Sequence, residues 1–266
     1  MASISIQAEF NHPEIITQLD KSYGVRNKVY IVANEFGRGQ TQETLAKTDQ
    51  VKNGFHIGFS TTENFNFLLT RHSVGAIIAD ISDNACEFQE LVKKIILESD
   101  TPEEFLTKIE QDRRASPEKY CNFNQRSIDT EKAFPHSWLH NRENFQKIRS
   151  YYQEGRIFHL HLSVTDVERF KAINTWMKLN NLALDTLYLA NIADWFWDIG
   201  DDERPSLEQM KLAIAEVINQ QTLIVDASST FPRHPGQCGL TQAVFTGLST
   251  YDPHQSRQDA YLTNPR

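Results

Sequence analysis

The chain has 266 residues and a net charge of −8, with 39% hydrophobic and 23% charged residues. This length allows one large α/β domain or a domain with an appended lobe, and a chain of this size buries roughly 75% of its unfolded surface. The negative charge argues against general binding to nucleic acid, which requires a basic face. A small anionic or zwitterionic ligand remains compatible with the composition.

The cysteines and the N-terminus indicate a compartment. The three cysteines, Cys86, Cys121 and Cys238, are far apart and form no Cys-x-x-Cys pair, which favours a reducing environment. The first ten residues lack the basic and apolar regions of a signal peptide, and no apolar run approaches the ~18 residues that span a bilayer. We therefore expect a cytoplasmic protein without a membrane span, although a protein exported without a cleaved signal has the same features. Nothing in the sequence indicates an oligomeric state.

Residues 1–53 are predicted to form an N-terminal extension. Pro13 suits the first turn of a helix, residues 29–32 fit either a strand or a helix, and Gly-Arg-Gly at 37–39 predicts a turn. The simplest interpretation is a cap on a sheet edge. The alternative is a lid or substrate lobe, because loops over a site often carry specificity.

Residues 54–80 carry the most informative pattern. An apolar run at 54–59 predicts a strand, a helix is expected from Thr62 to Arg71, and a second strand from Gly75 to Ile81. The side chains expected on the buried face of this helix are Phe65, Leu68, Leu69 and His72. Asp80 stands at the tip of the second strand. This order is typical of a nucleoside-type site at the edge of a parallel sheet.

The rest of the chain alternates between helices and strands. Helices are expected over 84–112, with a second start at 100–104, and over 141–154, 167–179 and 207–220, the last capped by Ser206. Strands are expected over 156–162, 185–191, 222–226 and 241–248. Residues 113–139 read as a polar, irregular insertion. The sequence thus predicts a doubly wound, mostly parallel α/β domain over 54–252, followed by a polar tail over 253–266.

Polar residues follow the ends of several predicted strands, where doubly wound sheets bind ligands. The candidate binding residues are Gly58, Ser60, Asn64, Asp80, Asp166 and Asn191. Gly58 would let the backbone approach a ligand, Asp80 could accept from ribose hydroxyls, Asp166 could accept from an adenine amino group, and Asn191 could line the reacting end. Each has an alternative, because Asp and Asn at strand ends often cap helices or form turns.

Several motifs resemble class I S-adenosylmethionine-dependent methyltransferases, and more closely a poorly characterised branch with that Rossmann-like domain. They are Gly58, Glu63-Asn64-Phe65-Asn66-Phe67, Ile77-Ile78-Ala79-Asp80-Ile81, Ser137-Trp138, residues 151–157, Asp166 and Tyr188-Leu189-Ala190-Asn191-Ile192. The resemblance covers the central half to two-thirds of the chain. It implies an S-adenosylmethionine-dependent transferase that methylates a small-molecule or protein substrate.

The chain departs from that pattern at the cofactor loop. His56 stands where an acid is usual, Ser60 where a second glycine is usual, and Ser82-Asp83 where basic residues are usual. The alternative is therefore a degenerate Rossmann-like binding or interaction module. No metal site is expected, although His159 and His161 point to the same side of a strand. His56 and His159 are the candidates for a general base, and the Trp195–Trp197 segment could contact a substrate.

Overall fold

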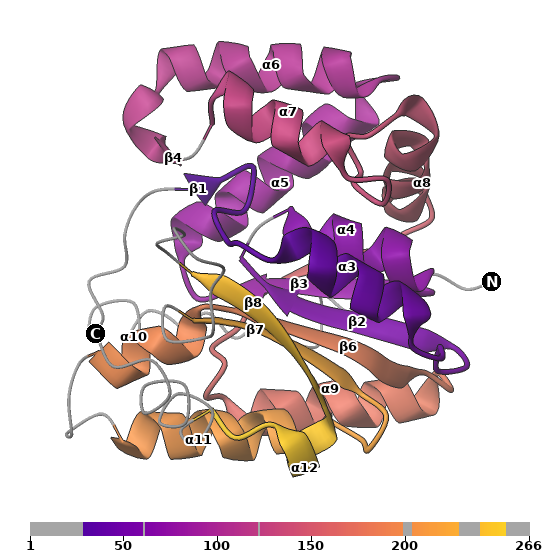
Figure 1. The fold of residues 1–266 in the computed structure, drawn as a ribbon, viewed down its shortest axis with the longest axis vertical. Helices are drawn as coiled ribbons and strands as arrows, with labels where there is room; N and C mark the ends of the chain where they lie inside the picture. Colours follow the sequence, from indigo (N-terminus) through magenta and orange to yellow (C-terminus); the bar gives the residue numbers. More distant parts are fainter. Residues whose placement is uncertain (1–28, 61, 122, 199–203, 229–239, 254–266) are drawn as a thin grey trace. The chain divides into compact units, whose positions relative to one another are not determined.

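The computed structural model describes residues 29–60, 62–121, 123–198, 204–228 and 240–253 (Figure 1). Six of the described strands form one sheet in the order β5-β3-β2-β6-β7-β8. Their bounds are β2 (Gly54–Phe59), β3 (Ala76–Asp80), β5 (Ile157–His161), β6 (Ala183–Ala190), β7 (Leu223–Ser228) and β8 (Thr241–Thr246). The β3–β5, β2–β6 and β6–β7 pairs are parallel, and β8 runs antiparallel to β7. The predicted doubly wound, mostly parallel α/β fold is confirmed.

The order of the strands fixes where a ligand is expected. Numbered along the chain, these strands lie in the order 3-2-1-4-5-6, which is the Rossmann order. The order reverses between β2 and β6, which pair directly from Gly54 and Ala183 to Gly58 and Tyr188. Every residue of β2 and β7 is buried, as expected for strands covered on both faces. The carboxyl ends of β2 and β6 therefore form the topological switch point of the sheet.

The chain divides into two compact units, which we describe separately. Unit 1 contains residues 1–33 and 59–163, and unit 2 contains residues 34–58 and 164–266. The predicted division into 1–53, 54–252 and 253–266 stays a prediction. The helix expected at Pro13 and the tail beyond residue 253 lie outside the described residues.

Unit 1 holds β3, β5 and a group of helices. The helices are α4 (Glu63–Arg71), α5 (Asp83–Leu97), α6 (Pro102–Ala115), α7 (Gln125–Ala133) and α8 (Arg142–Gln153). Two helices begin as expected: Thr101 accepts from the N–H of Glu104 at the start of α6, and Asn141 caps α8. Gly155 follows α8 with φ of 64°, the left-handed conformation that favours glycine.

An aromatic cluster organises the core of unit 1. Trp138 is fully buried and lies edge-on to Phe65 and Phe105, with ring centroids 5.1 and 4.8 Å apart, and it stacks on Phe145 at 6.0 Å. The preferred geometries of aromatic pairs add to the burial of their large apolar surfaces. Trp138 therefore fastens the loop before α8 to α4 and α6.

Two expectations for unit 1 are wrong. The 113–139 insertion is not irregular, because it contains α7, which Asn124 caps, and the short strand β4 (Tyr120–Cys121), which pairs in parallel with β1 (Val29–Tyr30). The sequence could not reveal β4, because its pairing partner lies about ninety residues earlier. Helix α4 is buried on every side, and His72 ends it in the exposed, left-handed C-cap position instead of joining the buried face.

Unit 2 holds the remaining strands of the sheet. Its helices are α3 (Arg38–Lys47), α9 (Val167–Leu179), α10 (Ile192–Asp198), α11 (Arg204–Ala215) and α12 (Gly247–Thr250). Helix α9 contacts β6 and runs beside α11, and α3 contacts β8 (Figure 1).

Three boundaries in unit 2 differ from the expectation. Gly37 forms the expected turn with φ of 77°, but α3 begins directly after it. Helix α11 already begins at Arg204, because Pro205 suits a first helical turn, so Ser206 lies inside the helix and is not its cap. Strand β8 stops at Thr246, because Gly247 turns the chain with φ of 58°. Within the described part of the chain, no helix is both long and apolar enough to cross a membrane.

Candidate functional site

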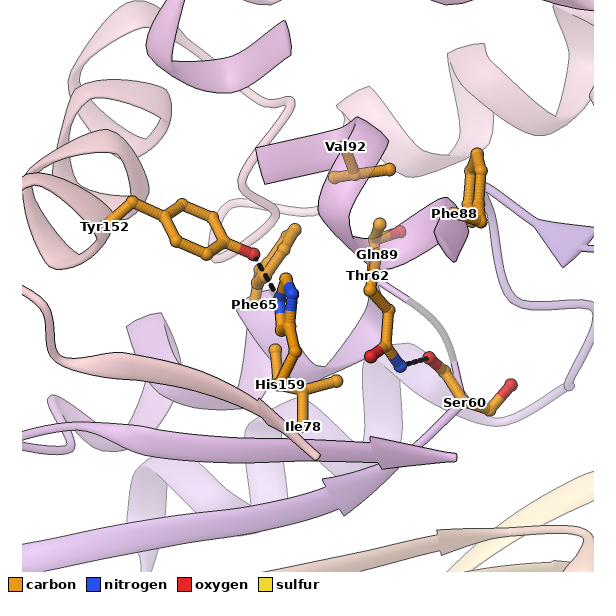
Figure 2. Close-up of a pocket in the computed structure, with 9 residues that line it drawn as sticks. All are labelled: Ser60, Thr62, Phe65, Ile78, Phe88, Gln89, Val92, Tyr152 and His159. Atoms are coloured by element: carbon orange, nitrogen blue, oxygen red, sulfur yellow. Dashed lines mark hydrogen bonds between the residues drawn. The ribbon is translucent and has the colours of Figure 1, made fainter. Parts of the chain in front are cut away.

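The loop after β2 has the backbone conformation of a glycine loop. Ser60 has φ of 70°, a left-handed conformation that costs a residue with a side chain about 1–3 kcal/mol. Its N–H donates to the carbonyl of Ala79 at 3.0 Å, and its carbonyl accepts from Nε2 of Gln89 at 3.2 Å (Figure 2). The geometry explains why glycine is usual at this position. It also shows that serine is held there by bonds on both sides of its backbone.

Asp80 lies beside this loop. It ends β3 and is partly buried, and its Oδ1 accepts the N–H of Ser82 at 2.9 Å, just before α5 begins. Because Ser60 is bonded to Ala79, the loop after β2 and the acid at the tip of β3 are neighbours in unit 1. The structure thus joins two of the sequence-predicted binding residues. It also shows that Asp80 takes part in the turn that starts α5.

Asn64, in the first turn of α4, stabilises the start of the same loop. Its side chain is fully buried in α4, and its Nδ2 donates to the carbonyl of Phe59 at 3.2 Å. This bond ties the end of β2 to the first turn of the helix. Direct contact between Asn64 and a ligand stays a prediction.

The other three predicted residues belong to unit 2. Gly58 pairs with Tyr188, three residues before Asn191, so both lie at the carboxyl end of the β2–β6 pair. Ala190 has φ of 50°, and the carbonyl of Asn191 accepts the N–H of Asp194 as α10 begins. Left-handed alanine is strained, and such strain collects at functional positions.

Asp166 is a helix cap in this structure. Its Oδ1 accepts the N–H of Arg169 at 3.1 Å, and its Oδ2 lies 3.3 Å from Nε of the same arginine. This is the structural alternative that strand-end acids often take. A contact between Asp166 and an adenine group stays a prediction.

A small pocket lies behind the Ser60 loop. Figure 2 shows the residues that line it: Ser60, Thr62, Phe65, Ile78, Phe88, Gln89, Val92, Tyr152 and His159. Its accessible space of about 20 Å³ holds about one water molecule, whereas sites for drug-sized ligands measure about 300 Å³ or more. This pocket is therefore a packing feature beneath the loop and not a nucleoside site.

A hydrogen-bonded chain of three side chains borders the pocket. His159 Nδ1 lies 2.7 Å from Oε1 of Glu90. Its Nε2 lies 3.0 Å from the hydroxyl of Tyr152, the bond that Figure 2 shows. The bond from His159 lowers the pKa of Glu90, and burial raises the pKa of Tyr152 well above its usual value. Tyr152 therefore stays protonated, and His159 links its hydroxyl to the carboxylate of Glu90.

His159 and His161 have separate partners in the structure. His161 bonds the carbonyl of Ile81 and lies 3.3 Å from Asp83, so its partners differ from those of His159. Within the described ranges, no group of His, Cys, Asp and Glu is suited to hold a metal ion. His56 is fully buried, and its Nδ1 lies 2.7 Å from Oγ1 of Thr186, so it braces β2 against β6.

The sequence missed a buried polar network in unit 1. The side-chain amide of Asn66 donates to Glu63 at 2.9 Å and to Glu131 at 2.7 Å, and its oxygen accepts the N–H of Trp138 at 3.0 Å. Ser137 donates to the same oxygen of Glu131 at 2.7 Å. All of these side chains are at most 1% exposed. Two of the motifs that carry the family resemblance, Asn66 and Ser137-Trp138, thus bind each other.

Comparison with known proteins places the chain in a family. The fold is that of a doubly wound α/β protein with Rossmann strand order. The chain belongs to the family described as domain of unknown function DUF7790, whose model matches residues 30–122 and 118–237. No curated protein matches the chain.

Two solved structures of the rRNA methyltransferase aviRa from Streptomyces viridochromogenes are similar to the chain, both at 15% identity. The match to one of them has a TM-score of 0.42 and covers 88% of this chain and 90% of the aviRa chain. The other has a TM-score of 0.41 and covers 84% and 89%. Similarity at this level does not transfer the activity of that enzyme to this chain.

Proposed function

We propose that the protein is an S-adenosylmethionine-dependent transferase, and that it moves a methyl group to a small-molecule or protein substrate. The observation that carries the proposal is the glycine-like conformation of Ser60, bonded to Ala79 beside the carboxylate of Asp80. A tight loop after the first strand and an acid at the tip of the second are the two parts that hold a nucleoside in this fold.

The chemistry of the residues fits this cofactor. A partly buried carboxylate at the tip of β3 accepts hydrogen bonds from ribose hydroxyls, and Gly58 has no side chain to obstruct the approach of a ligand to the strand end. We propose Gly58, Ser60, Asn64, Asp80, Asp166 and Asn191 as the residues that form or support the site. When bound, S-adenosylmethionine supplies an activated methyl group, and the chain mainly orients the acceptor.

The second candidate function is a binding or interaction module without catalysis. It is favoured by the capping bonds of Asp166 and by the buried bond of Asn64, because these structural roles require no ligand. The two candidates differ in one property, the affinity for the cofactor.

Calorimetric titration with S-adenosylmethionine and S-adenosylhomocysteine tests the proposal. We expect micromolar binding to the wild-type chain and a loss of at least tenfold in Asp80→Asn. The asparagine keeps an oxygen for the N–H of Ser82, so the turn is preserved while the charge is removed. Asp83→Asn, an exposed acid three residues later, is the matched control and should bind normally. Folded wild-type protein that binds neither compound would defeat the proposal.

A further inference from the structure

A buried carboxylate in unit 2 has no role in the site described above. Glu35 precedes α3 and is only 8% exposed. The hydroxyl of Tyr188 donates to it, at 3.0 Å from Oε1 and 2.9 Å from Oε2, and Nε2 of Gln242 donates to Oε2 at 2.7 Å. Burying a carboxylate is costly unless it is hydrogen-bonded, and these bonds offset part of that cost for Glu35.

The backbone around Glu35 is held firmly in place. The N–H of Phe36 donates to Leu240 at 2.7 Å, and the carbonyl of Phe36 accepts from Gln242 at 3.0 Å. These bonds lay the segment alongside the start of β8. Gly37 turns the chain into α3, and a Cβ there would lie 3.5 Å from the carbonyl of Gln242. The backbone bonds of the neighbouring residue, Phe36, therefore fix the position of Glu35.

Glu35 bonds to a residue near the carboxyl edge of the sheet. Its partner Tyr188 pairs with Gly58 on β2 and with Val225 on β7. Tyr188 precedes Asn191 by three residues, or about 10 Å along a strand. The side chain of Tyr188 thus brings Glu35 close to the switch point between β2 and β6, where doubly wound sheets bind their ligands.

One unsatisfied polar atom belongs to a side chain that binds this carboxylate. The Oε1 of Gln242 is buried and has no hydrogen-bond partner, in a side chain that is 7% exposed. A buried acceptor without a donor is costly, so a ligand that donates a hydrogen bond there recovers that cost. The amide that leaves this oxygen unsatisfied is the same one that donates to Glu35.

We propose that Glu35 and Gln242 bind the amino group of a small primary amine, the acceptor substrate of the transferase. An ammonium group has three donors and no acceptor, which complements a carboxylate and an amide oxygen. The burial of the cluster favours a small molecule over a side chain of a protein. The role of the amine as the acceptor substrate rests on the proposed function. Binding of the amine does not, and it can be tested by itself.

Titration of the 266-residue chain with methylammonium, followed by NMR, tests the amine site. We expect saturable shifts of the Gln242 side-chain amide signal and of the backbone amides of β8. Tetramethylammonium carries the same charge without donors and should produce no such shifts. The Glu35→Gln variant should lose the response. If that variant folds poorly, Gln242→Met replaces it in the test and should also lose the response. Asp226→Asn is the matched control, because Asp226 is another buried acid that accepts from a tyrosine, Tyr251, at 3.0 Å.

Two outcomes would overturn the inference. One is the absence of saturable shifts with methylammonium, and the other is an equal response to tetramethylammonium. Calorimetry with S-adenosylhomocysteine on the same samples separates this failure from failure of the proposed function. Glu35→Gln should bind that compound as the wild type does. A methylammonium response in a protein that binds no S-adenosylhomocysteine would support the amine site and defeat the transferase.

Discussion

Replacing Asn66 by leucine tests whether the family-like motifs hold the fold of unit 1 together. Leucine has the same branched arrangement of side-chain heavy atoms as asparagine but offers no hydrogen bond. The change removes the two bonds to Glu63 and Glu131 and the bond from the N–H of Trp138. All four side chains are at most 1% exposed, so water cannot replace these partners.

The size of the effect follows from these bonds. A hydrogen bond to a charged group contributes about 1.5–3 kcal/mol, and a buried N–H left unsatisfied costs about 1–3 kcal/mol. Summed without coupling, the loss lies between about 4 and 9 kcal/mol, and leucine recovers part of it by apolar burial. We therefore expect Asn66→Leu to lower the free energy of unfolding by about 4 kcal/mol. That is a large fraction of the 5–15 kcal/mol typical of a folded domain.

Urea unfolding followed by far-UV circular dichroism measures this loss. The control is Asn180→Ala at the end of α9, where a partly buried asparagine donates a single bond to Trp176 at 2.8 Å. Its cost should be about 1 kcal/mol. If Asn66→Leu costs no more than the control, the network does not stabilise unit 1 and our explanation of the motifs is wrong.

Three further predictions concern single residues. Ser60→Gly should change the free energy of unfolding by less than about 1 kcal/mol, because the relief of strain at positive φ offsets the greater freedom of the unfolded chain. Ser60→Val should lower it by about 2 kcal/mol. Equal urea midpoints for the glycine and valine variants would refute the strain at this position. Asp166→Ala should lose about 1 kcal/mol, and Asp166→Ser should restore the cap but weaken S-adenosylhomocysteine binding; normal binding by the serine variant would leave Asp166 as a cap alone. Glu90→Gln should cost at most about 1 kcal/mol at neutral pH, because Glu90 is half exposed. The pKa of Glu90 is lowered in the folded state, so its stabilisation is present above the unfolded pKa and disappears as the pH falls through the folded value; a difference from wild type that stays constant into acid would contradict this.

Much of the fold was predictable because local patterns agree with it. The apolar runs at 54–59 and 76–80 form strands, and the helices expected from 100–104 and from 141 begin after Thr101 and Asn141. The errors occur where the local structure depends on contacts with segments that are distant in the sequence. Strand β4 exists only because β1 pairs with it, and a short polar segment carries no periodic signal of its own.

The candidate site was only partly predictable. Position along the strands correctly brought Ser60 beside Asp80, because strand ends follow from the fold class. The sequence could not tell that Asn64 would point at Phe59 or that Asp166 would cap α9, since both roles suit the same residue types. Glu35 was missed because its partners, Tyr188 and Gln242, lie more than 150 residues away in the chain.

The most direct test of the central claim is a crystal structure with S-adenosylhomocysteine bound. We predict that both ribose hydroxyls lie within hydrogen-bond distance, about 2.5–3.0 Å, of the Asp80 carboxylate, with the ligand against the Ser60 loop. A ligand bound elsewhere, or a ribose with no contact to Asp80, would contradict the account.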